Sequence, residues 1–135
     1  KEVSDLNLGV EGINKFARNF YFDNVEDRAG VDPLRSVVYM RGKSPTWYRG
    51  YGKETIDKNE FAAIARNMGA KKFVIGHTLH ESVTYLMDKQ VIDLDVLHAQ
   101  GTTQGLLIEN GQEYMVDIQG QKSAIKERAK EVDDD

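Results

Sequence analysis

The chain has 135 residues, of which 40% are hydrophobic, and it carries a formal net charge of −4 with a pI near 5.4. This length suits one domain with a single core, and the acidic balance excludes a general electrostatic attraction to nucleic acid or to an anionic membrane, so any anionic ligand needs a local basic site. The absence of cysteine excludes disulfides, a thiolate nucleophile and cysteine-ligated metal sites within the chain.

Two amphipathic helices are predicted in the first half of the chain. Apolar residues recur at helical spacing from Leu8 to Phe22 and from Asp57 to Met68, and Gly69 supplies the C-terminal cap of the second helix. Between the helices, Asp23 to Pro33 is expected to be a charged loop. Leu34 to Met40 could be a short helix or an apolar strand, because its periodicity does not distinguish the two.

A loop rich in basic and aromatic side chains is predicted from Arg41 to Gly52. Glycines and a proline interrupt it, which is typical of a shaped loop rather than of a regular element. Arg49 lies in this loop beside Trp47 and Tyr48. A planar guanidinium among aromatic rings suits bidentate capture of a phosphate, but the same Arg could stack on Trp47 or Tyr51 at the surface without any function.

The segment from Lys72 to Thr78 leads an apolar strand into a Gly-His step. Phe73 to Ile75 is predicted to be a strand covered on both faces, and Gly76 to turn the backbone tightly. His77 then lies at the carboxyl end of the strand, where open α/β sheets bind their ligands. We therefore expect function to centre on His77, and the alternative is a hydrogen-bonded structural histidine.

Two β-hairpins are predicted after His77. Alternating apolar residues favour a first hairpin from Val83 to Val96 and a second from Gln104 to Ile118, whose Asn110-Gly111 turn tolerates positive φ angles. We expect both hairpins to lie in one sheet, with the strand at Lys72–Ile75 alongside.

The end of the chain is strongly charged. A thin apolar stripe from Gln121 to Val132 predicts a surface helix, and the acidic tail Asp133 to Asp135 follows it. The order of elements is two helices, a buried strand and then two antiparallel hairpins. This order indicates an α+β layered domain.

The run from Thr46 to Gly120 resembles the C-terminal half of the calcineurin-like metallophosphoesterases, and within them the bacterial Shewanella-like protein phosphatases. The resemblance rests on the Trp-Tyr-Arg-Gly motif that begins at Trp47, on the strand that enters Gly-His-Thr at His77, and on the strands that follow. It implies an αββα sandwich in which His77 binds one metal of a two-metal centre. It also implies that Arg49 contacts the substrate phosphate and that Trp47 and Tyr48 adjoin it.

Three metal motifs that this family carries upstream, Asp-x-His, Gly-Asp-x-x-Asp-Arg and Asn-His-Glu, do not occur in the chain. A two-metal centre needs a bridging carboxylate and several further ligands, which one histidine cannot replace. The resemblance therefore implies that residues 1–135 are one partial domain, whose partner is the missing N-terminal half. The complete enzyme would use two divalent ions of manganese, iron or zinc. This fragment alone is expected to be inactive, to bind metal weakly or not at all, and to self-associate through uncovered strand faces.

The remaining histidines and carboxylates give weaker signals. His98 follows the strand Val91–Val96 and is a second candidate metal ligand, whereas His80 is expected to be an exposed polar residue. Asp93 and Asp95 alternate with apolar residues, as on the solvated face of a strand, although Asp95 could also orient an imidazole.

One function is favoured and one alternative stays open. The favoured function is hydrolysis of a phosphorylated protein, a nucleotide or a small phosphate ester by a binuclear metal centre in the complete protein. The alternative is a non-catalytic interaction module whose loop, Arg41 to Gly52, binds an anionic or peptide partner. The sequence shows no signal peptide and no apolar run near the roughly 20 residues of a membrane span, so we expect a cytoplasmic protein.

Overall fold

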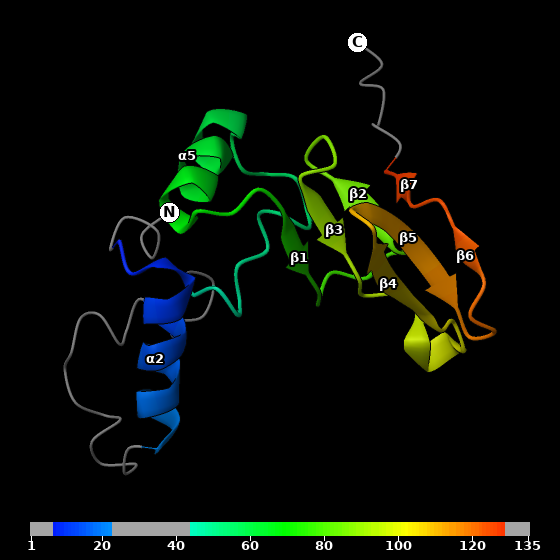
Figure 1. The fold of residues 1–135 in the computed structure, drawn as a ribbon, viewed down its shortest axis with the longest axis horizontal. Helices are drawn as coiled ribbons and strands as arrows, with labels where there is room; N and C mark the ends of the chain where they lie inside the picture. The colour runs from blue at the N-terminus through cyan, green and yellow to red at the C-terminus, as the bar shows by residue number, and fades with distance from the viewer. Residues whose placement is uncertain (1–6, 23–43, 129–135) are drawn as a thin grey trace. The chain divides into compact units, whose positions relative to one another are not determined.

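The structure is a computed structural model that describes residues 7–22 and 44–128, with the side chains of residues 20–22 left out (Figure 1). The chain divides into two compact units, one made of Lys1–Gly50 and Ile56–Lys71 and the other of Tyr51–Thr55 and Lys72–Asp135. The prediction that the whole chain is one partial domain stays a prediction. The segments expected as a loop at 23–33 and as a helix or strand at 34–40 lie outside the described residues.

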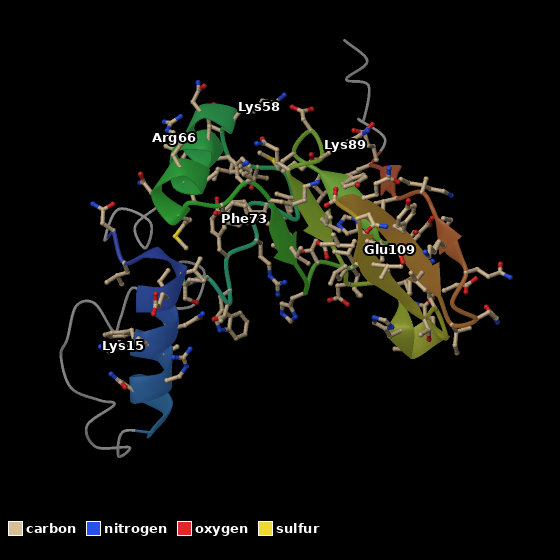
Figure 2. All side chains as sticks on the ribbon, viewed as in Figure 1. Lys15, Lys58, Arg66, Phe73, Lys89 and Glu109 are labelled. Carbon is tan, nitrogen blue, oxygen red and sulfur yellow. The ribbon has the colours of Figure 1, made fainter. Side chains whose placement is uncertain are left out.

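Two helices of the first unit lie in the described residues, α2 (Gly9–Phe22) and α5 (Lys58–Met68), which confirms both predicted helices. Helix α5 has the capping residues that its sequence predicts. The Asp57 carboxylate accepts the N–H groups of Asn59 and Glu60 at 2.9 and 3.1 Å, and Gly69 ends the helix at a φ of 63°. Figure 2 labels Lys58 and Arg66 on this helix, which buries Phe61 and Ile64.

The second unit contains a four-stranded mixed sheet with the strand order β1-β3-β2-β7. Its strands are β1 (Phe73–Ile75), β2 (Thr84–Leu86), β3 (Val91–Asp93) and β7 (Lys126–Glu127). Strands β2 and β3 pair antiparallel, which confirms the first hairpin, and β1 pairs parallel to β3. Three consecutive residues in the turn between β2 and β3 have positive φ angles, namely Met87, Asp88 and Lys89, the last of which is labelled in Figure 2.

A second sheet has the strand order β4-β5-β6. It is formed by β4 (Gln104–Glu109), β5 (Gln112–Asp117) and β6 (Lys122–Ser123). Strands β4 and β5 are antiparallel and are joined by Asn110 and Gly111, with φ angles of 51° and 75°. Positive φ at both central residues is the condition for a tight two-residue turn, so the second hairpin is confirmed.

The core of the second unit lies between these two sheets. It consists of four buried residues with partly buried apolar side chains around them: Val83, Ile92, Val96 and Ile125, surrounded by Tyr85, Leu94, Leu106 and Met115. At the edge of this core, the Glu113 carboxylate pairs with the Lys72 ammonium and accepts a hydrogen bond from the Tyr85 hydroxyl at 3.0 Å. Polar contacts therefore also join the two sheets. The predicted α+β class is confirmed.

The two hairpins lie in different sheets, so the prediction of a single sheet was wrong. Strand β3 already has β1 on one side and β2 on the other, and β2 has β7 on its free side. No edge of β2 or β3 is therefore open to β4. The 3₁₀ turn η1 (His98–Gln100) and Gly101, with a φ of 91°, redirect the chain between β3 and β4.

Two further expectations need correction. The helix predicted from Gln121 to Val132 does not form in its described part, because residues up to 128 make β6 and β7 and bury Ile125 between the sheets. Residues 129–135 lie outside the described part of the chain. Among the described strands, β1 lies at the edge of its sheet. It is not covered on both faces as predicted, since Val74 is 48% exposed. Within the described residues, no helix is long and apolar enough to cross a bilayer.

Candidate functional site

The loop that carries Arg49 begins with a turn centred on Pro45 and Thr46. The carbonyl oxygen of Ser44 accepts the N–H groups of Trp47 and Tyr48, each at 3.0 Å, and the Ser44 hydroxyl bonds the Thr46 hydroxyl at 3.0 Å. Ser44 is fully buried, so this turn is anchored in the first unit. The expectation of an irregular, shaped loop is confirmed over residues 44–52, and Arg41 to Lys43 lie outside the described residues.

Tyr48 folds back over the glycine that follows Arg49. A Cβ at Gly50 would lie 2.1 Å from the Tyr48 hydroxyl oxygen, so only glycine leaves room for this ring. Burial, and to a lesser extent the charge of Glu60, raise the pKa of Tyr48 above its ordinary value. The phenol, already protonated at neutral pH, can donate a hydrogen bond. Arg49 is half-buried beside it, and Trp47 is 39% exposed.

The Gly-His step lies directly after β1, as predicted, but the strained residue is the histidine. His77 has a φ of 73°, in the left-handed region, whereas Gly76 does not adopt a positive φ. A left-handed conformation costs a non-glycine residue about 1 kcal/mol. The left-handed residue of the step is therefore His77, not Gly76. The exposed His77 side chain lies at the carboxyl end of β1, and such strain is typical of functional sites.

The segment Tyr51–Thr55 supports this region within the second unit. The Tyr51 ring packs against the Phe73 ring of β1 with the centroids 5.6 Å apart (Figure 2, where Phe73 is labelled). A Cβ at the buried Gly52 would lie 2.4 Å from the Thr78 hydroxyl oxygen, so the Thr78 side chain lies directly on the glycine. Thr78 is the residue after His77, and its packing holds the Gly-His step against this segment.

A buried histidine–carboxylate pair lies next to the Gly-His step and was missed by the sequence analysis. His80 Nε2 is 3.4 Å from Asp93 Oδ2, the Asp93 side chain is fully buried, and the His80 side chain is only 14% exposed. Two expectations were therefore wrong, that His80 is exposed and that Asp93 lies on a solvated strand face. All three residues of β3 are buried. An acidic residue next to two apolar residues in one strand is the sequence signal that could have indicated this pair.

The Asp93 carboxylate is held in one orientation by its own strand. Its Oδ1 atom accepts the Asp95 N–H at 3.0 Å, which turns Oδ2 toward His80. Burial raises the pKa of Asp93 above its ordinary value, and the Asp95 carboxylate adds to this, while the Asp95 N–H and His80 oppose it. Asp95 contributes its backbone groups here: its N–H donates to Asp93, and its carbonyl oxygen accepts the His80 N–H at 2.9 Å.

The described residues do not form a metal centre by themselves. No group of three or more His, Asp or Glu side chains among them could hold a metal ion, so His77 and His98 are not joined there by a third ligand. His98 lies exposed in η1. Arg49 belongs to the first unit and His77 to the second, so their convergence on one phosphate stays a prediction.

Solved structures of a phosphatase match this fold. A cold-active protein-tyrosine phosphatase of a psychrophilic Shewanella species has a TM-score of 0.75 and 28% sequence identity over 90% of this chain. Two further structures of a cold-active protein tyrosine phosphatase, one of them a mutant, give the same TM-score and identity. This chain covers 36% of the length of each of them. No family model and no curated protein sequence matches the chain. The fold is therefore phosphatase-like.

Proposed function

We propose that this chain contributes one part of the active site of a phosphatase that hydrolyses phosphate esters. The observation that carries the proposal is the match of most of the chain, with detectable sequence identity, to a protein-tyrosine phosphatase. Because the chain covers only about a third of that phosphatase, the remaining chemistry would come from segments outside this chain. A phosphorylated protein or a small aryl phosphate is the substrate class that the match favours.

Arg49 is proposed to bind the phosphoryl oxygens. A guanidinium donates two parallel hydrogen bonds to a phosphate and stabilises the charge that develops during ester cleavage. The Tyr48 hydroxyl would add a neutral donor, while the partly exposed Trp47 ring could contact an aryl group of the substrate. The anchored turn at Ser44 would fix these three side chains before substrate binds.

His77 is proposed to contribute one ligand to a metal centre of the metallophosphoesterase type. The chain has no cysteine, so none of its residues can be a thiolate nucleophile. Two divalent cations, of manganese, iron or zinc, would polarise a phosphate ester when bound. The described residues do not fit such a centre alone, so its other ligands would lie elsewhere in the complete protein and this chain by itself would be inactive.

Kinetics of the complete phosphatase with an aryl phosphate test the role of Arg49. Arg49→Ala should raise KM about 10- to 100-fold and lower kcat, because a hydrogen bond to a charged group contributes about 1.5–3 kcal/mol. Arg49→Lys should recover only part of the loss, since an ammonium cannot bind in bidentate fashion. Arg66→Ala is the matched control, because it removes an exposed Arg from α5 (Figure 2). Unchanged kinetics in Arg49→Ala would refute the assignment.

The alternative function is a non-catalytic module that binds an anionic or peptide partner through the loop from Arg41 to Gly52. Its supporting observation is that Trp47 is 39% exposed on an anchored turn. This alternative predicts that the complete protein has no activity with any aryl phosphate, and that Trp47→Ala abolishes partner binding. Measurable turnover that requires Arg49 decides for the phosphatase.

A further inference from the structure

The residues 76–79, here named the arch, join the end of β1 to His80 and contain His77. Both ends of the arch are tied to the segment that continues β3. At the first end, the Ile75 carbonyl oxygen accepts the Leu94 N–H at 2.9 Å. At the second end, the His80 N–H donates to the Asp95 carbonyl oxygen at 2.9 Å, and His80 forms a bridge with Val96. The backbone of His77, with its φ of 73°, lies between the two anchored ends.

The His80 side chain adds a third attachment at the second end. Its Nε2 atom lies 3.4 Å from Asp93 Oδ2, on a carboxylate that is fully buried and oriented through Oδ1 by the Asp95 N–H. Among the described residues neither Nε2 nor Oδ2 forms a hydrogen bond, so the contact between the two atoms is an electrostatic one at ion-pair distance. We propose that His80 and Asp93 form a positioning pair that anchors the arch to β3 and thereby orients His77.

The chemistry of the pair supports a geometric role over one in stability. Burying a histidine and a carboxylate is expensive, and apolar side chains of similar size fill such a place at least as favourably. An apolar pair gives no electrostatic attraction, whereas a buried carboxylate whose Oδ2 is aimed at Nε2 attracts that edge of the imidazole. An orienting contact of this kind suits His77, a strained residue whose side chain must point in one direction to act. The link from His77 to catalysis rests on the proposed function, but the anchoring does not.

NMR spectroscopy of the 135-residue chain tests the anchoring directly. In His80→Leu, the backbone signals of His77 and Thr78 should move, and the His80 amide should exchange about tenfold faster than global unfolding explains. In His80→Gln, whose side-chain amide can still donate to Asp93, both readouts should return toward the wild type. Leu86→Ala is the control, because it removes a buried side chain of β2 and lowers global stability without touching the arch.

Two outcomes would overturn the proposal. One is a His80→Leu chain whose His77 signals and His80 exchange match those of the wild type. The other is a His80→Gln chain as perturbed as His80→Leu. His80→Leu could fail to fold because it leaves Asp93 without its partner. The double variant His80→Leu/Asp93→Leu then replaces it, since it removes both polar groups together. The proposal requires the same changes in the His77 and Thr78 signals from that double variant.

Kinetics of the complete phosphatase test whether the pair acts through His77. His80→Leu should lower kcat about tenfold with little change in KM, as is typical of groups that orient a functional side chain. The double variant His77→Ala/His80→Leu should be no slower than His77→Ala alone, whereas additive losses would overturn the link. If the wild type shows no phosphatase activity, the proposed function fails, and the NMR measurements still decide the anchoring.

Discussion

Asp93 Oδ2 lies 3.4 Å from His80 Nε2, and the Asp93 side chain has no exposed surface. Burial raises the pKa of the Asp93 carboxyl above its ordinary value of 3.8. The folded protein therefore holds this proton more tightly than the unfolded chain does. The stability that Asp93 contributes is full below pH 3.8 and is lost as the pH rises through the raised folded-state pKa.

Asp93→Asn should remove this pH dependence, because an amide does not ionise. We expect the free energy of unfolding of Asp93→Asn, relative to the wild type, to increase between about pH 3 and about pH 7. Urea denaturation at the two pH values measures the change. Leu86→Ala is the control, since the loss of a buried aliphatic side chain should lower the free energy of unfolding by about the same amount at both pH values. A difference between Asp93→Asn and the wild type that does not vary with pH would contradict the raised pKa.

The left-handed backbone of His77 gives a second prediction. Glycine adopts a φ of 73° without steric cost, so His77→Gly should be more stable than His77→Ala by about 1 kcal/mol, measured by urea denaturation. Both variants should lose the proposed function equally, because both lack the imidazole. If the backbone strain at His77 serves function, His77→Gly should gain stability over His77→Ala while activity is lost.

Gly76→Ala is the matched control for this backbone argument. Gly76 does not have a positive φ, and a Cβ built there has no atom within 4 Å. Its replacement should therefore change stability by less than about 1 kcal/mol. A His77→Gly variant no more stable than His77→Ala would show that the His77 backbone is not strained.

The elements of the fold that could be predicted from the sequence are those with local signals. Asp57 and Gly69 cap α5 through bonds to residues within one turn, and Asn110-Gly111 fits only a tight hairpin turn. The separation into two sheets depends on which strand edges are already occupied, and that is decided by β7, over 30 residues after β3. A two-residue strand such as β7 has no periodicity, so the apolar stripe that includes Ile125 predicts a helix instead.

The candidate site was predictable only in part, for a related reason. The apolar strand before His77 indicated where that histidine lies, but nothing in Gly-His shows which of the two residues takes the positive φ. Asp93 was missed because alternation reports burial only when one face of a strand is exposed to solvent. In β3 every residue is buried, so the alternation of Asp93 with apolar neighbours carried no information about exposure.

A third prediction concerns Gly52, on which the arch rests. A Cβ at this position would lie 2.4 Å from the Thr78 hydroxyl oxygen and 2.7 Å from the Thr78 Cβ. Because the second atom is fixed to the backbone, the arch would have to move, and we expect Gly52→Ala to cost about 1–3 kcal/mol in thermal or urea denaturation. Adding Thr78→Gly removes the clash and should recover part of the loss.

Gly105→Ala provides the comparison for Gly52. A Cβ at Gly105 in β4 meets no atom within 4 Å, so this variant should be nearly as stable as the wild type or slightly more stable. If Gly52→Ala were equally harmless, the close packing of Thr78 on Gly52 would be wrong.

The last prediction is that the isolated chain self-associates through the open edge of β1. The expectation of uncovered strand faces was wrong for β2 and β3, because Val83 and Ile92 are buried in the core. Strand β1 is an edge strand of its sheet in the described part of the chain, and Val74 at its centre is 48% exposed. An exposed apolar edge strand can pair with the same edge of a second copy, and a charged residue there blocks such pairing. Light scattering or sedimentation of the 135-residue chain should show an assembly larger than a monomer, and Val74→Lys should shift it toward the monomer. Ile118→Lys makes the same chemical change at a more exposed position in a turn after β5, so it should leave the assembly unchanged. A wild-type chain that stays monomeric at all concentrations, or an equal effect of the two lysine variants, would rule out the β1 edge as the contact.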